Sequence, residues 1–223
     1  MNKSKSFAVL GLGRFGKSLV RSLAESGHEV LACDTNMEAV REMAQYATEA
    51  VQLDVTDEMA LHSMDLGQFD VVVVTIGTDL TSSVMATLFA KQSGAKLVVA
   101  KAYNETQKLI LEKVGADRVV LPEWEMGAKI ATELSYPNIL DYIALSKDYG
   151  LMEIAPLPAW INHTILKNNI RAAAGINIMA IKRGDGVIIS PKPDEIIHSG
   201  DILVTICEKK DLHRLNIYAD GKF

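Results

Sequence analysis

Residues 11–16, GLGRFG, constrain the fold of this chain more than any other segment. They fit the pattern Gly-x-Gly-x-x-Gly, follow a strand-like run at 6–11, and open a helix-like run in which Phe15, Leu19 and Leu23 recur at four-residue spacing. In that setting glycines permit a tight turn and a close approach of the backbone to phosphate, and the free N–H groups and positive dipole end of the helix hold the anion. The segment therefore predicts the phosphate-binding turn of a βαβ nucleotide-binding unit.

The first 135 residues continue the alternation that this turn begins. Strand-like runs rich in Val, Leu and Ile alternate with helix-like segments, among them 79–93, 105–114 and 125–134. Near-continuous apolar strands suit a parallel sheet covered on both faces. We expect an α/β fold with a Rossmann-type doubly wound sheet over residues 1–135. Its six predicted strands are 6–11, 29–34, 50–53, 70–76, 96–100 and 118–121.

The pattern changes after Pro137. Residues 136–148 read as a linker helix, with Ile139, Leu140 and Ile143 on one side. Residues 149–223 then predict a small α+β domain with a helix near 163–170, strands at 176–181, 187–189 and 201–206, and a short final helix. The sequence Arg183-Gly184-Asp185-Gly186 between two apolar runs predicts a hairpin turn, because Asp-Gly tolerates the positive φ angles that such turns require.

Asp34 ends the second predicted strand, and a carboxylate there accepts both hydroxyls of an adenosine ribose. Polar residues also follow later strands at their carboxyl ends, where ligands of open α/β sheets gather. Arg14 inside the loop suits a terminal phosphate, as in ATP or ADP, or is simply a solvated arginine at a helix start. Lys101 either reaches phosphate or is a surface lysine. The predicted nucleotide site comprises Gly11, Gly13, Arg14, Phe15, Gly16, Asp34, Thr35, Asp54, Val55, Thr75, Ile76, Gly77, Lys101 and Glu123.

Composition excludes several functions. The net charge is −5 and the 23 Lys and Arg are scattered, so nucleic acid is not expected as a partner. The longest apolar run, 71–76, is far short of the roughly 20 residues of a membrane helix, and no signal peptide is visible. Cys33 and Cys207 read as buried, reduced thiols of a cytoplasmic protein, and no Cys/His cluster has zinc spacing.

Acid–base machinery is the missing element for an enzyme of this fold. The Tyr-x-x-x-Lys pattern at 218–222 contains a glycine and lies near the end of the chain, and the five histidines fall in no acid–base motif. No nucleophile elbow and no Walker motif occurs. We therefore expect a protein that binds a nucleotide without turning it over.

The order of motifs along the chain resembles a known family. Residues 11–17 (GLGRFGK), 34, 54–58 (DVTDE), 76–77, 100–103 (AKAY), 115–117 (GAD) and 122–123 are similar to the RCK (KTN/TrkA-N) domain of bacterial Ktr and Trk potassium-uptake systems. Residues 171, 175–182 (GINIMAIK) and 199–203 (SGDIL) are similar to the RCK_C (TrkA-C) domain. A single pair of these domains resembles the short Ktr type.

This resemblance implies a cytoplasmic gating subunit that forms octameric rings, as tetramers of dimers, beneath a KtrB-like membrane channel. ATP would favour the conducting ring and ADP the inactive one. Arg14 would contact the terminal phosphate, and Glu123 would help to place a divalent cation, Mg²⁺ or Ca²⁺. The helix expected at 139–145 would pack on a neighbouring subunit, or else on its own domain.

Cyclic di-AMP is a second ligand that the resemblance implies, bound between two copies of the C-terminal domain. The candidates by position are Asn169, Arg171, Ile178 and Pro191. The alternative is that Ile178 is core and Arg171 a surface residue. Two other functions stay open on sequence grounds: an NAD(H)-dependent oxidoreductase, and a nucleotide sensor not tied to a channel.

Overall fold

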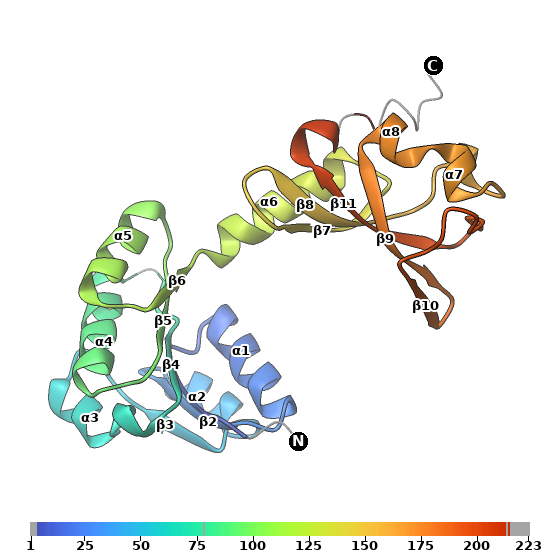
Figure 1. Ribbon diagram of the computed structural model, residues 1–223. Helices are drawn as coiled ribbons and strands as arrows, with labels where there is room; N and C mark the ends of the chain where they lie inside the picture. The colour runs from blue at the N-terminus through green and yellow to red at the C-terminus, as the bar shows by residue number, and fades with distance from the viewer. Residues whose placement is uncertain (1–3, 78, 213, 215–223) are drawn as a thin grey trace. The chain divides into compact units, whose positions relative to one another are not determined.

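The computed structural model describes residues 4–77, 79–212 and 214. The chain divides into two compact units, Met1–Glu123 and Trp124–Phe223. The first is a six-stranded sheet in the order β3-β2-β1-β4-β5-β6 with every neighbouring pair parallel (Figure 1). The strands are β1 (Ser6–Leu10), β2 (Glu29–Asp34), β3 (Glu49–Gln52), β4 (Val71–Val74), β5 (Val98–Lys101) and β6 (Arg118–Val120). The predicted doubly wound Rossmann-type sheet is confirmed.

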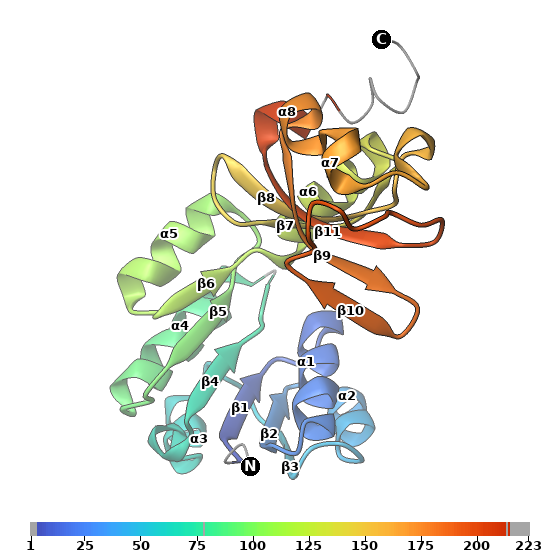
Figure 2. The same ribbon diagram turned by 45° about the vertical axis from the view of Figure 1, so that its right-hand side comes forward.

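Helices cover both faces of this sheet (Figure 2). One face packs on α1 (Arg14–Glu25) and α2 (Met37–Met43) through a cluster that includes Val20, Val40 and Met43. The other packs on α3 (Glu58–Ser63), α4 (Leu80–Gln92) and α5 (Glu105–Val114), where Leu61 and Leu111 are fully buried. Strand order reverses between β1 and β4, so their carboxyl ends open a crevice at the edge where ligands of such sheets bind.

The second unit is built on an antiparallel five-stranded sheet in the order β10-β9-β11-β8-β7. The strands are β7 (Ile139–Ala144), β8 (Tyr149–Ile154), β9 (Ile176–Arg183), β10 (Gly186–Ile189) and β11 (Ile202–Glu208). Burial alternates along β8 and β11, as expected of a sheet with one covered face. The covered face meets Trp160, Ile170 and Ile197. This confirms a small domain of mixed helix and strand, and the hairpin predicted at 184–186 joins β9 to β10.

The structure of this unit differs from the sequence prediction at several places. The linker helix expected at 139–145 is strand β7, because Ile139, Leu140 and Ile143 fit either period and pairing with β8 decides between them. Strand β8 itself was not predicted. The helix before β7 was expected at 125–134 and is longer in the structure, where α6 runs over Pro122–Ser135.

The single helix expected near 163–170 is two short ones, α7 (Ile165–Asn168) and α8 (Ile170–Ala174). Asn169 separates them with a left-handed φ of 47°. Of the predicted final helix, a 3-10 turn η3 (Lys209–Asp211) is described and the segment from 215 on lies outside the described residues.

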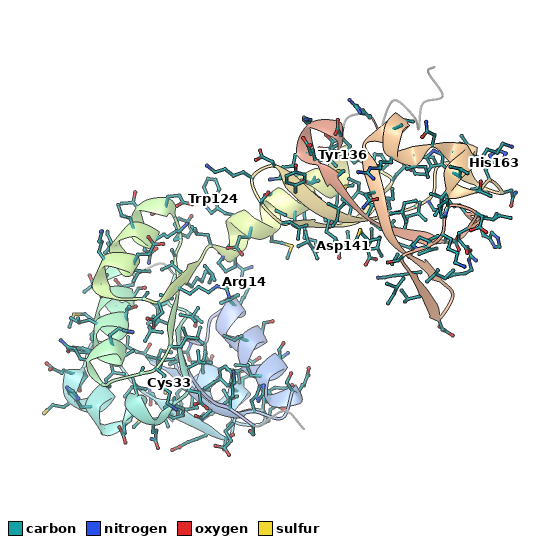
Figure 3. The ribbon with its side chains drawn as sticks, viewed as in Figure 1. Arg14, Cys33, Trp124, Tyr136, Asp141 and His163 are labelled. Atoms are coloured by element: carbon teal, nitrogen blue, oxygen red, sulfur yellow. The ribbon has the colours of Figure 1, made fainter. Side chains whose placement is uncertain are left out.

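No helix within the described residues is both long enough and apolar enough to cross a membrane. Cys33, on β2, is labelled in Figure 3. It and Cys207, on β11, are both buried and form no disulfide. Burial raises the pKa of the Cys33 thiol to about 12 and that of Cys207 to about 11. These thiols are therefore protonated packing groups at neutral pH.

Candidate functional site

A cavity of about 330 Å³ opens at the carboxyl ends of the parallel strands, beside the crevice between β1 and β4. Nine of its twelve lining residues belong to the site predicted from the sequence, and Leu53, Asp79 and Ser82 were not anticipated. Asp79 comes shortly after strand β4 and Gly77, at the carboxyl end of that strand. This position in the sequence could have indicated that Asp79 belongs to the site. The lining is Gly11, Gly13, Asp34, Thr35, Leu53, Asp54, Val55, Thr75, Ile76, Gly77, Asp79 and Ser82.

The glycine loop joins β1 to α1 in a conformation that only small residues allow. Gly11 has a φ of 106°, and its N–H donates to the carbonyl of Cys33 at 2.8 Å. At Gly16, a Cβ would lie 2.0 Å from the carbonyl oxygen of Gly11 and 2.7 Å from Oγ1 of Thr75. At Gly13, by contrast, a Cβ would meet no atom within 4 Å. Gly16 thus serves helix–strand packing, while Gly13 leaves open space beside the cavity.

Helix α1 begins without a side-chain cap. Its N-cap is Gly13, and no side chain accepts from the first turn. The N-caps of α2, α4 and α5 are Asn36, Asp79 and Asn104, and each side chain accepts a backbone N–H. The first N–H groups of α1 are therefore available to an anion, which is the arrangement that binds phosphate at a helix N-terminus.

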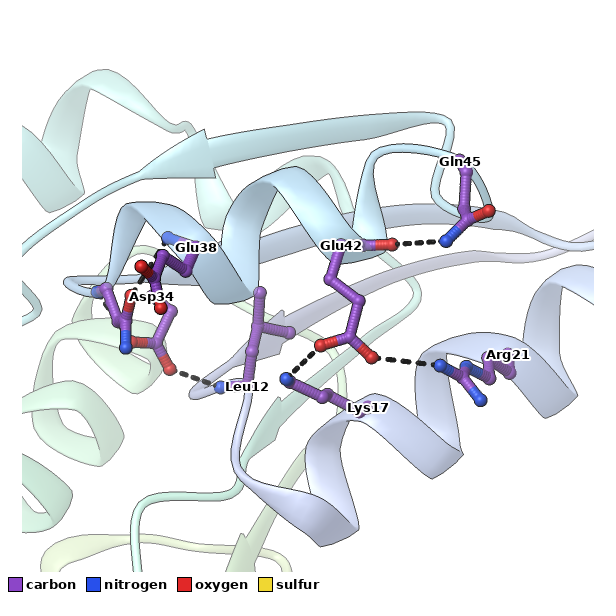
Figure 4. A network of polar contacts seen from close by, with 8 residues as sticks. Leu12, Lys17, Arg21, Asp34, Glu38, Glu42 and Gln45 are labelled. Carbon is purple, nitrogen blue, oxygen red and sulfur yellow. Dashed lines mark hydrogen bonds and ion pairs between the residues drawn. The ribbon is translucent and has the colours of Figure 1, made fainter.

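Asp34 links the glycine loop to the second strand (Figure 4). One carboxylate oxygen accepts the N–H of Leu12 at 2.5 Å, and the other accepts the N–H of Asn36 at 2.8 Å. Each oxygen retains a lone pair, so the carboxylate is fixed in place and can still accept ribose hydroxyls. Behind it, Glu42 of α2 pairs with Lys17 and with Arg21 of α1, which ties the two helices together.

Two more carboxylates line the cavity. Hydrogen bonds from the amide and hydroxyl of Thr56 lower the pKa of Asp54, and a hydrogen bond from the hydroxyl of Ser82 lowers that of Asp79. No Lys or Arg is among the described residues that line this cavity. Three carboxylates accept hydroxyl and amino groups and repel phosphate, so the cavity fits the sugar and base of a nucleotide, with its phosphates directed to α1.

The remaining predicted residues gather beside the cavity, apart from Gly16, which lies under the loop. The ammonium of Lys101 lies 2.6 Å from Glu123 and 5.8 Å from the ring centroid of Phe15. The hydrogen bond from Lys101 lowers the pKa of Glu123, and the charge of Arg14 adds to the effect. Arg14 itself is exposed at the first position of α1. We call Arg14, Phe15, Lys101 and Glu123 the charged corner.

The charged corner supplies a single carboxylate as a possible metal ligand among the described residues. Among the described residues, no group of three or more His, Cys, Asp or Glu side chains is placed to hold an ion. The one carboxylate is that of Glu123, and it already forms an ion pair with Lys101. A divalent ion there would need ligands from phosphates or from another copy.

A second cavity, of about 310 Å³, lies in the C-terminal unit. It brings together all four residues predicted to bind cyclic di-AMP: Asn169, Arg171, Ile178 and Pro191. The left-handed Asn169 separates α7 from α8, and Arg171, the second residue of α8, is exposed. An arginine beside apolar side chains suits a phosphate joined to a base.

Comparison with known proteins shows what the chain is similar to. A model of the TrkA-N domain matches residues 7–122, and a model of the TrkA-C domain matches residues 151–216. The chain is 43% identical over 210 residues to Ktr system potassium uptake protein C of Bacillus subtilis, which covers 94% of this chain and 95% of that protein. It is 42% identical over 212 residues to Ktr system potassium uptake protein A of the same organism, with 95% and 96% covered.

Solved structures share the fold. The RCK domain of GsuK superposes with a TM-score of 0.65 at 15% identity, covering 99% of this chain and 53% of that one. At that identity the likeness concerns the architecture alone.

Proposed function

The chain belongs to the family of TrkA-N/TrkA-C potassium-uptake proteins of the Ktr type, and we propose that it is a nucleotide-sensing regulatory subunit of a potassium channel or transporter. The observation that carries the nucleotide part is the cavity of three carboxylates next to an uncapped helix N-terminus. This combination offers acceptors for a ribose and a base on one side and backbone donors for phosphates on the other.

Arg14 is the residue we assign to telling ATP from ADP. It is the first residue of α1, exposed, and close enough to Glu123 to influence its pKa. A ligand shifts a conformational equilibrium only by binding two states unequally, and the γ-phosphate is the group that distinguishes ATP from ADP. We propose that ATP stabilises the active arrangement through Arg14 and that ADP, lacking this contact, does not.

We propose that a second copy of the chain covers the exposed face of α6. None of its residues is buried, and Trp124 and Leu134 are 66% and 79% exposed, with Met126 and Ile130 also exposed. Exposed apolar side chains grouped on one helix are typical of a protein–protein interface. We propose homo-oligomerisation, with a dimer as the unit of an octameric ring. We propose that the ring binds a KtrB-like channel at the cytoplasmic face of the membrane, so that the protein would lie in the cytoplasm.

Two further ligands stay predictions. Cyclic di-AMP would bind in the second cavity, where Arg171 lies beside Ile178 and Pro191. A divalent cation at Glu123 would have to share that carboxylate with Lys101. NAD(H) remains the competing ligand for the first cavity, since Asp34 accepts any adenosine ribose. The oxidoreductase reading is not favoured, because the relatives at 42–43% identity are potassium-uptake proteins.

Thermal melting of the purified chain with ATP, ADP, NADH and cyclic di-AMP tests the proposal. A ligand that binds only the folded state raises the melting temperature. ATP is expected to raise the melting temperature more than NADH does, and Asp34→Ala is expected to reduce the stabilisation by both ligands. Stabilisation by NADH alone would contradict the proposed sensing of ATP.

A further inference from the structure

Thr75 is a buried threonine at the point where the glycine loop leaves the sheet. It directly follows β4 and is 6% exposed, and its N–H donates to the carbonyl oxygen of Leu10 at 2.8 Å. Its hydroxyl lies 2.5 Å from the carbonyl oxygen of Gly11 and 3.2 Å from that of Leu10. A hydroxyl has one proton to donate, and the shorter contact is the stronger one, so this proton belongs to the Gly11 carbonyl.

The peptide group between Gly11 and Leu12 is fixed at both of its ends. Its carbonyl oxygen accepts from Thr75. Its N–H, which belongs to Leu12, donates to Oδ2 of Asp34 at 2.5 Å (Figure 4). A trans peptide group is planar and its carbonyl and N–H point in opposite directions, so two partners on opposite sides prevent it from rotating. One partner follows β4 and the other ends β2, the two strands that flank β1 in the sheet.

The same carbonyl packs against the start of α1. A Cβ at Gly16 would lie 2.0 Å from the carbonyl oxygen of Gly11 and 2.7 Å from Oγ1 of Thr75. The hydroxyl and the carbonyl therefore fill the space that a side chain at this position of α1 would need. The N-cap Gly13 and the first turn of α1 follow the fixed peptide directly. The orientation of that peptide thus sets the direction of the N–H groups that are free for phosphate.

From this geometry we propose that Thr75 is a positioning residue of the phosphate-binding turn and not a direct contact of the nucleotide. Its hydroxyl donates its only proton to the Gly11 carbonyl and has none left for a phosphate oxygen, which can only accept. Asp34 holds one end of the peptide and Thr75 holds the other. The inference rests on the proposed nucleotide function for its binding test, whereas its structural test needs no nucleotide.

Amide hydrogen exchange of the ligand-free full chain, read by mass spectrometry with overlapping peptides, is the structural test. Thr75→Val removes the hydroxyl and keeps the branched shape. Thr75→Ala removes the hydroxyl without placing a methyl group against the Gly11 carbonyl. In both variants we expect the Leu12 amide to exchange roughly tenfold faster than in wild type, because its peptide group can rotate. Amides within β2 and β4 are expected to keep their wild-type rates.

Calorimetry with ADP is the binding test. We expect both variants to lower the affinity for ADP by roughly three- to tenfold, the scale of one hydrogen bond, because the free N–H groups of α1 lose their alignment. Thr75→Ser keeps the hydroxyl. It is expected to restore both the slow exchange of the Leu12 amide and the affinity for ADP.

Thr87→Val is the matched control. Thr87 is fully buried on α4, and its hydroxyl donates to the carbonyl oxygen of Ser83 at 2.7 Å. The substitution removes the same group from a buried threonine whose hydrogen bond stays within one helix. The exchange of the Leu12 amide and the affinity for ADP should both remain at their wild-type values.

Unchanged exchange of the Leu12 amide in Thr75→Val and Thr75→Ala overturns the inference, even if the affinity for ADP falls, because a direct contact would then explain that loss. Faster exchange with unchanged affinity overturns it too, as does faster exchange spread over the whole sheet. If wild type binds neither ADP nor ATP, the proposed function fails, and the exchange measurement still reports separately on the peptide group.

Discussion

Gly13→Ala separates nucleotide binding from folding. Gly13 has a φ of −68° and a ψ of −175°, which alanine adopts without strain, and its Cβ would touch nothing within 4 Å. Alanine is a poorer N-cap than glycine, which lowers the free energy of unfolding by about 0.5–1 kcal/mol. Alanine also lowers the conformational entropy of the unfolded chain, which raises the free energy of unfolding by about 0.4–1 kcal/mol. The two effects offset each other, so the melting temperature of the ligand-free protein should change by no more than about 2 °C.

The added methyl group nevertheless lies where phosphate must approach the first N–H groups of α1. Losing hydrogen bonds to a charged group costs about 1.5–3 kcal/mol, so we expect ATP and ADP affinity to fall roughly 10- to 100-fold. Isothermal titration calorimetry measures the affinities, and circular dichroism follows the melting.

Gly16→Ala is the matched comparison, three residues further along. Its Cβ would lie 2.0 Å from a backbone carbonyl oxygen, so α1 or the loop has to move. Overpacking of this kind costs roughly 3 kcal/mol, and we expect the melting temperature to drop by about 6–12 °C. Normal ATP affinity in Gly13→Ala, or normal melting in Gly16→Ala, would refute these separate roles of the two glycines.

Four further outcomes follow from the same structure. Asp34→Ala should lower the affinities for ATP and ADP equally, because both nucleotides carry the same ribose, and by roughly tenfold or more, the scale of a lost hydrogen bond to a charged group. Arg14→Ala should lower the affinity for ATP more than that for ADP. Equal losses in calorimetry would reject the role assigned to Arg14. The hydrogen bond from Lys96 lowers the pKa of Asp70 from 3.8 to about 2, so its contribution to stability is present above about pH 4 and lost as the pH falls toward 2. Melting curves of wild type and Asp70→Asn should therefore converge between pH 4 and 2, and a constant gap would contradict this. Cys33, with a pKa raised to about 12, should react with iodoacetamide at pH 8 only after unfolding, as mass spectrometry of native and urea-treated protein would show.

The exposed face of α6 could not be located from the sequence. The resemblance to the family implied a helix at 139–145 that packs on another copy. Those residues form strand β7, which carries the exposed apolar side chains of Leu140 and Ile143, and α6 carries a second exposed apolar set that the sequence did not single out. A run such as Ile139-Leu140-x-x-Ile143 fits both periods, and only hydrogen bonds to β8, a partner further along the chain, resolve it.

The first unit was predictable because its signals are local. Each βα repeat carries its own apolar strand, its own amphipathic helix and its own turn residues, and the glycine loop and Asp34 stand at fixed places within one βαβ unit. Parallel strands necessarily meet at one edge, so residues at their carboxyl ends can be grouped from the sequence. The cavity contains nine of them.

Which side chains form ion pairs, and which line the cavity together, was decided by the tertiary structure alone. Lys101 and Glu123 are 22 residues apart, and no pattern in the sequence shows that the lysine faces a carboxylate and not a phosphate. Asp79 and Ser82 line the same cavity as the glycine loop, and no sequence pattern pairs the start of α4 with that loop. The sequence thus determined the fold of the first unit and the edge where a nucleotide binds, since both depend on short-range periodicity and backbone geometry. The charge balance of the site depends on contacts between distant segments, and folding alone brings those together.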